Sequence, residues 1–162
     1  MTPEPITTAP IQPVEPGYRN VLRAGASIFW LPVLVGSIVL ENLVLRELPI
    51  AGLAPVLVAL VAFSSILVAP ERIYRRLGYS FEAGLLRVVR GWLFHSDTIV
   101  PFVRVQHIDV NRGPLDKLFG TASLVVHTAG THNSIVTLPG LSPDRAAEIR
   151  EVIRGSIRTD FE

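Results

Sequence analysis

Two long apolar segments constrain the fold of this 162-residue chain more than any other feature. Residues 24–40 contain no charged side chain, and neither do residues 48–69. A bilayer core about 30 Å thick is crossed by about 20 apolar residues in a helix, so both segments are long enough to span a membrane. We therefore expect a transmembrane helical hairpin at residues 19–70, with its helices at about 24–45 and 49–69.

Two other interpretations of these segments fit less well. Two buried helices in a soluble protein would need a polar face, which neither segment has, or a much larger surrounding chain. A signal peptide has an apolar run of about 7–15 residues and a small-residue cleavage site. The first segment is longer, no A-x-A site follows it, and a second span comes almost at once. The sequence therefore favours a hairpin that stays in the membrane.

Charged residues around the helices predict their orientation. Arginines flank the outer ends of the hairpin, and these are Arg19, Arg23, Arg72, Arg75 and Arg76. The short link between the helices has only Arg46, beside Glu47. The positive-inside rule then predicts a multi-pass protein of the cell membrane with both termini in the cytoplasm. Glu41 lies one turn from the link, where it reaches headgroups or Arg46; a proton or ion relay is the alternative.

Composition divides the rest of the chain. Five prolines within residues 1–16 predict a disordered, solvated tail at 1–18. A basic juxtamembrane linker at 71–78 leads to a domain at 79–158 and a short tail at 159–162. Apolar residues make up 49% of the chain and charged ones 18%, and this composition is too apolar for a disordered protein. The net charge of +1 argues against a nucleic-acid partner, and the lack of cysteine excludes disulfides.

The sequence of residues 79–158 predicts six or seven short strands and one final helix. A hairpin turns at 82–84, further strands are expected at 98–101, 102–110, 122–128 and 134–138, and 115–120 form a short helical turn. Such short connections require an antiparallel sandwich or partly open barrel. Ser142 is a good N-cap for a helix whose apolar stripe includes Ala146, Ile149, Ile153 and Ile157. This is the layout of a pleckstrin-homology (PH) domain.

Several motifs within the domain carry a family resemblance. They include R-V-Q-H-x-D-V at 104–110 and G-P-L-x-x-x-x-G at 113–120, and the similarity extends from about residue 19 to 157. The chain resembles the YdbS-like family of bacterial membrane-anchored PH-domain proteins. The resemblance implies an α+β membrane protein: a two-helix transmembrane hairpin, then a PH-like antiparallel barrel or sandwich capped by a C-terminal helix. The signature residues, which we interpret as structural, are Arg104, Gln106, His107, Asp109, Gly113, Pro114, Leu115 and Gly120.

No catalytic, metal or cofactor motif is apparent in the sequence. His107 and Asp109 share a strand face if the strand is regular, but a metal site would need His127 as a third ligand, and the structural interpretation is preferred. The serines lack a G-x-S-x-G context, and no carboxylate pair suggests acid–base chemistry. The sequence therefore predicts no enzyme, no bound metal and no cofactor.

Three functions are compatible with this pattern. The leading hypothesis is a protein-interaction or assembly module, with a protein partner or a second copy, for which Trp92 and Phe94 are candidate contacts, although core packing is the favoured interpretation of both. The second is binding of anionic lipid headgroups by Arg72, Arg75, Arg76 and Arg87. The first hairpin loop, at 82–84, lacks the basic residues of phosphoinositide-binding PH domains. The third is an accessory subunit of a transporter or protease, built around Glu41.

Overall fold

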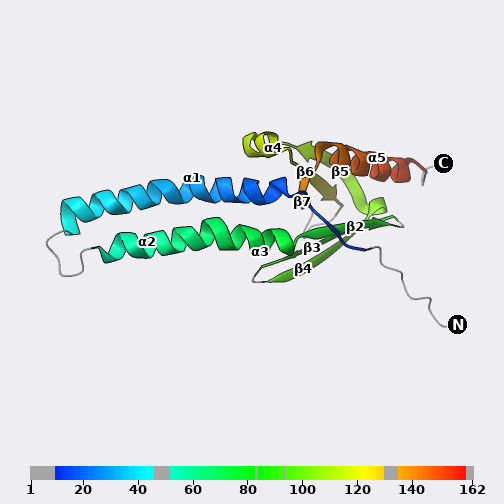
Figure 1. Cartoon of the computed structure of the whole chain (residues 1–162). Coiled ribbons are helices and arrows are strands. Elements are labelled where there is room, and N and C mark those ends of the chain that lie inside the picture. The colour runs from blue at the N-terminus through cyan, green and yellow to red at the C-terminus, as the bar shows by residue number, and fades with distance from the viewer. Residues whose placement is uncertain (1–9, 46–51, 83, 93, 130–134, 160–162) are drawn as a thin grey trace.

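The computed structural model describes residues 10–45, 52–82, 84–92, 94–129 and 135–159. Two long helical segments project side by side from one end of a β-domain (Figure 1). The first is α1 (Gly17–Leu40), which continues through a π-helical turn at Glu41–Leu45. The second joins α2 (Leu53–Phe63), a π-helical turn at Ser64–Val68 and α3 (Ala69–Arg75). Both are long and apolar enough to cross a membrane.

The helical segments extend further toward the domain than the sequence predicts. The first begins at Gly17 rather than near residue 24, and the second ends at Arg75 rather than at 69. Glu71 on α3 accepts hydrogen bonds from Arg75 at 2.8 Å and from Arg19 on α1 at 3.2 Å. These ion pairs let the charged ends stay helical and hold the two helices together. The predicted link between the helices, at 46–49, lies outside the described residues.

Glu41 is buried at the far end of the hairpin, with only 9% of its surface exposed. Its Oε1 accepts a hydrogen bond from the backbone N–H of Gly52, the residue before α2 begins. The N–H groups at a helix start have no partner within the helix, so a carboxylate is a favourable acceptor there. The predicted contact with Arg46 lies outside the described residues, whereas this contact with the start of α2 was not anticipated.

Two antiparallel sheets form a sandwich that does not close into a barrel. The first sheet has the order β1-β2-β3-β4, and the second β5-β6-β7. The strands of the first sheet are β1 (Gln12–Pro13), β2 (Gly78–Glu82), β3 (Leu85–Gly91) and β4 (His95–Pro101). Those of the second are β5 (Val105–Asn111), β6 (Ala122–Thr128) and β7 (Ile135–Leu141). The short helix α4 (Pro114–Phe119) joins β5 to β6, and α5 (Pro143–Thr159) follows β7. This confirms the PH-like α+β architecture.

Helix α5 closes the hydrophobic core. Ser142 accepts a hydrogen bond from the backbone N–H of Arg145 at 3.2 Å, which confirms the predicted N-cap. Ala146, Ile149 and Ile153 are fully buried and pack with the inner faces of both sheets. The stripe arises because residues three and four apart lie on one face of a helix. The structure does not describe the side chain of the fourth predicted member, Ile157.

The prediction of a solvated tail at 1–18 is wrong for its described part. Gln12 and Pro13 form β1, which pairs with β2 at Tyr79 and Gly78, and Val14 is only 3% exposed. Proline fits an edge strand because an edge residue need not donate its N–H to a neighbour. The domain therefore includes chain from before the hairpin as well as after it. Residues 1–9 lie outside the described part.

The hairpin is joined to the domain by direct packing rather than by a flexible linker. The predicted linker at 71–78 is mostly helical, and only Arg76 and Leu77 separate α3 from β2, with Leu77 buried. On the other helix, a Cβ added to Gly17 would collide with the carbonyl oxygen of Phe119 in α4. This close contact fixes α4 against the first turn of α1. The helices therefore hold the domain in a set orientation.

Candidate functional site

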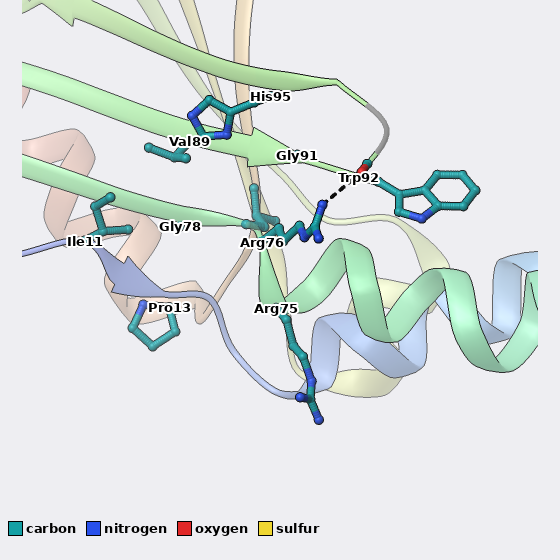
Figure 2. A pocket seen from close by; sticks show the side chains of 10 residues that line it. Ile11, Pro13, Arg75, Arg76, Gly78, Val89, Gly91, Trp92 and His95 are labelled. Atoms are coloured by element: carbon teal, nitrogen blue, oxygen red, sulfur yellow. Dashed lines mark hydrogen bonds between the residues drawn. The ribbon is translucent and has the colours of Figure 1, made fainter.

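A cavity lies where α3 enters the first sheet. Its volume is about 560 Å³, and its walls come from β1, the end of α3, β2, β3 and β4. Val89, Gly91 and His95 line it from the sheet, and Arg75 and Arg76 lie at its helical edge (Figure 2). The register pairs Gly78 with Val89 and Gly91 with His95, which brings these three strands to one end of the domain. The cavity is therefore at the end from which the helices leave.

The two arginines at this cavity have different partners. Arg76 Nη1 donates to the backbone carbonyl oxygen of Trp92 at 3.0 Å, which attaches the β3–β4 turn to the end of α3 (Figure 2). This carbonyl is neutral, and Arg76 has no carboxylate partner among the described residues. Arg75 instead pairs with Glu71, and at the cavity's edge its side chain extends away from Arg76 and Trp92 (Figure 2). Glu71 also lies within 3.6 Å of Arg23, so this single carboxylate offsets several arginines.

The other two predicted lipid residues do not join this cavity. Arg72 is exposed on α3 and does not line it. Arg87 lies further along β3, where its Nε and Nη2 donate to both carboxylate oxygens of Asp97 at 2.5–3.1 Å. These hydrogen bonds and the guanidinium charge hold the pKa of Asp97 below its ordinary value of 3.8. Of the four predicted arginines, Arg75 and Arg76 line this cavity, and both Arg75 and Arg87 pair with a carboxylate.

Two aromatic residues at the β3–β4 turn are exposed. Trp92 is 43% exposed and Phe94 is 88% exposed. The favoured prediction of core packing is therefore wrong for both. Both residues stand just outside the ends of β3 and β4, where side chains leave the core, and the sequence alone did not indicate those strand ends. Their location beside α3 depended on the strand register, which the sequence alone did not supply.

Several signature residues shape the connection through α4. Gly113 precedes α4, Pro114 occupies its first turn, and Gly120 ends it with a φ of 70°. Asp116 accepts hydrogen bonds from Gly113 N–H at 3.0 Å and from the Thr121 hydroxyl at 2.7 Å. Proline suits a first helical turn, and glycine suits the left-handed residue after a helix. This part of the G-P-L-x-x-x-x-G motif therefore builds the turn between β5 and β6; Leu115 within it is half-buried.

The histidines of the second sheet come together around Asp109. His107 Nε2 lies 2.9 Å from one carboxylate oxygen, and His127 Nε2 lies 3.5 Å from the other. The Nε2 atoms of both histidines therefore face the Asp109 carboxylate and do not converge on a point where a metal ion could lie between them. Within the described ranges, no group of three potential ligands has an arrangement that could hold a metal ion.

The remaining signature residues lie at the start of β5. The 3₁₀ turn at Phe102–Arg104 precedes the strand, and the Arg104 carbonyl accepts a hydrogen bond from Ala129 N–H at 2.9 Å. A bulge interrupts the β5–β6 register between Val105 and His107. The single alternating strand expected at 102–110 is therefore irregular at its start. Gln106 lies at this bulge and is exposed.

Two apolar helices leading into a two-sheet sandwich with one closing helix define a membrane-anchored protein with a PH-like domain. Comparison with known proteins agrees with this class. The bacterial PH domain family matches residues 26–157, more than half of the chain, and the protein belongs to that family.

One curated relative is the UPF0699 transmembrane protein YdbS of Bacillus subtilis (strain 168), which is 30% identical over 89 residues. The match covers 55% of this chain and 54% of that protein, so the chain spans about half the length of its relative. No solved structure matches the chain. The membrane localisation and the YdbS-like resemblance are confirmed; the family is not an enzymatic one.

Proposed function

We propose that this chain is a non-enzymatic membrane protein whose PH-like domain acts on the cytoplasmic side as a protein-interaction module. The observation that carries the proposal is the edge position of β4, the last strand in the order β1-β2-β3-β4, which pairs with β3 alone among the described strands. An edge strand presents unpaired backbone N–H and C=O groups, to which an extended segment of another protein can add.

The surroundings of β4 favour such an added strand. A groove of about 450 Å³ follows six successive residues of β4, from Ser96 to Pro101. Its opposite wall is formed by Arg104, Thr128, Ala129 and Val136, from the second sheet and its connections. Ile99, in the middle of β4, is 56% exposed. The groove therefore offers hydrogen-bonding groups along one side and an apolar contact at its centre.

Crosslinking in intact membranes tests this proposal with the full-length chain. A stoichiometric crosslinked species, identified by mass spectrometry, is expected for the unmodified protein and lost in Ile99→Lys, because a charge on an edge strand opposes strand addition. Val152→Lys on α5 is the matched control, since Val152 is also partly exposed at 41%. A chain that forms no stoichiometric species, with a partner or with itself, contradicts the proposal.

The orientation in the membrane is part of the same proposal. Arg19, Arg23 and Arg72 cluster where the helices meet the domain, which favours the cytoplasmic side for the domain and both termini. A C-terminal tag is expected to resist protease added to intact cells and to be cleaved after the cells are opened. Cleavage in intact cells contradicts the orientation.

A second candidate function is the binding of anionic lipid headgroups. The observation that favours it is Arg76, whose charge faces no carboxylate among the described contacts and which lines the cavity at the membrane end of the domain. Near an anionic leaflet, each such cation contributes about 1 kcal/mol. In nanodiscs, Arg76→Gln is expected to reduce enrichment of phosphatidylglycerol around the full-length protein, and salt is expected to have the same effect. Enrichment that is unchanged in Arg76→Gln contradicts this function.

A further inference from the structure

Large apolar side chains are exposed on both sides of the helical hairpin, at the end of the domain from which it emerges. On the α3 side, Trp92 and Phe94 flank the β3–β4 turn, and Phe94 is 88% exposed. On the α1 side, Leu118 on α4 is 72% exposed. Exposed apolar side chains that gather at one end of a domain mark a surface that another apolar phase covers.

The register and one hydrogen bond fix the position of the β3–β4 turn. The strand β2 starts at Gly78, directly after α3, and Gly78 pairs with Val89, so the end of β3 extends past the start of β2 alongside α3. Arg76 holds the Trp92 carbonyl, and Trp92, Phe94 and Ile73 of α3 line one small cavity. Figure 2 shows the Trp92 indole pointing in the direction in which the helices leave the domain.

The position of α4 is fixed independently on the opposite side. Gly17 allows the Phe119 carbonyl to approach α1 closely, so α4 lies against the first turn of that helix. Figure 1 shows α4 on the outer side of α1 and the β3–β4 turn on the outer side of α3, with the hairpin between them. Lys117 is exposed next to Leu118, and Arg76 donates to the Trp92 carbonyl, which places a cation close to each apolar site.

We propose that these two apolar sites, Trp92 with Phe94 and Leu118, insert into the leaflet next to the domain, on either side of the hairpin, and fix the domain against the membrane. The occupant is the bilayer because the hairpin that crosses it leaves the domain between the two sites. Tryptophan is favoured at the membrane interface, and neighbouring Lys and Arg suit the headgroup level. The proposal rests on the membrane-spanning hairpin and does not require the β4 partner or anionic lipid.

Site-directed spin labelling tests the insertion directly, and the absence of cysteine from the sequence allows single-cysteine variants without other changes. The full-length variants Phe94→Cys, Leu118→Cys and Val103→Cys are labelled and placed in phosphatidylcholine nanodiscs. Val103 is the matched control, because it is 73% exposed but lies just after β4, at the opposite end of that strand from the β3–β4 turn.

The proposal predicts that labels at 94 and 118 collide with oxygen more, and with a water-soluble nickel complex less, than the label at 103. Insertion is expected to persist in high salt, because apolar contact with neutral lipid is not screened. Equal nickel collision at all three positions would overturn the proposal. Protection from both oxygen and nickel at 94 and 118 would also overturn it, since that result indicates burial against protein.

A second measurement avoids any change at the proposed sites. In Trp30→Phe, Trp92 is the remaining tryptophan of the chain, which has two. Its fluorescence is expected to be quenched by lipids brominated near the headgroup more than by lipids brominated near the chain end. Emission that no brominated lipid quenches would overturn the inference for the β3–β4 turn. Neither experiment depends on a protein partner, so failure of the insertion is distinguishable from failure of the proposed interaction module.

Discussion

The helical hairpin and the β-domain place their polar and apolar side chains in opposite ways. In the hairpin, the apolar side chains face outward, with Ile28 65% and Leu43 78% exposed, while the carboxylate of Glu41 is buried. In the domain, Leu124 and Ile149 are fully buried, whereas the charged pair of Arg87 and Asp97 lies on the surface. The difference follows from the surrounding medium, because lipid tails solvate apolar side chains as well as a protein core does.

The contrast between the two regions breaks down where α1 meets the β-domain. Val14 and Tyr18 come from chain near the start of α1, yet Val14 belongs to the domain core and Tyr18 packs against it. A glycine at 140, with a φ of 78°, leaves space for the Tyr18 ring, which a Cβ there would overlap. The two regions therefore differ in solvent but share a core, and a fragment that starts after the hairpin would lack part of its own domain.

The largest effect is expected from a cavity in the domain core. Ile149→Ala removes a fully buried side chain and is expected to cost about 2–5 kcal/mol of unfolding free energy. For a domain of fewer than about 100 residues this corresponds to a fall in melting temperature of about 8–40 °C. Trp92 fluorescence in a Trp30→Phe background reports the domain transition of the full-length protein in nanodiscs. Val152→Ala on the same helix is the control, and an equal fall in both variants would contradict the assigned core.

The next largest loss of unfolding free energy is expected from a variant in the segment before α1, and it tests whether that segment belongs to the domain. Val14→Ala removes two methyl groups from a site that is 3% exposed, and is expected to cost about 1.5–3 kcal/mol. Ile11→Ala is a suitable control because Ile11 is 49% exposed in the same segment. Both are measured by the same fluorescence transition. If Val14→Ala melts at the same temperature as the unmodified protein, the segment contributes no core packing.

The sequence predicted a helix or strand correctly where the pattern came from burial or capping within that element alone. The cap of α5, the described part of its apolar stripe and the strand at 122–128 were confirmed, since burial and capping act locally there. The prediction was wrong at Val14, because a proline-rich segment carries no sign of the partner strand that orders it. The candidate site was predicted only in part. The contact of Arg76 with Trp92 depends on a register that brings residues 16 positions apart together.

A smaller effect concerns the buried carboxylate of the hairpin. Glu41→Leu leaves the N–H of Gly52 without this acceptor, and an unsatisfied buried group costs about 1–3 kcal/mol. We expect faster hydrogen exchange of the Gly52 amide, by about 5- to 150-fold, measured by mass spectrometry on the protein in nanodiscs. Glu41→Gln keeps an acceptor oxygen and is expected to have a smaller effect. Identical exchange in Glu41→Leu and the unmodified protein would show that the carboxylate does not cap α2.

The smallest effect concerns the exposed ion pair of the domain, where charge faces water instead of lipid. Arg87 lowers the pKa of Asp97 in the folded state, so the ionised carboxylate stabilises the fold at every pH above its unfolded value, which is near 3.8. That contribution is lost as the pH falls through the lower folded value. We therefore expect the melting temperature of the unmodified protein to exceed that of Asp97→Asn at neutral pH.

The difference between these two proteins is expected to shrink below about pH 4, where the unfolded state takes up the proton first, and to be lost once the pH is also below the lower folded-state pKa of Asp97. Melting temperatures of both, measured in nanodiscs of neutral lipid between neutral pH and pH 2.5, give this profile. Because both side chains of the pair are more than a quarter exposed, added salt is expected to reduce the difference at neutral pH. A constant difference across the whole pH range would mean that Asp97 acts through packing rather than through its charge.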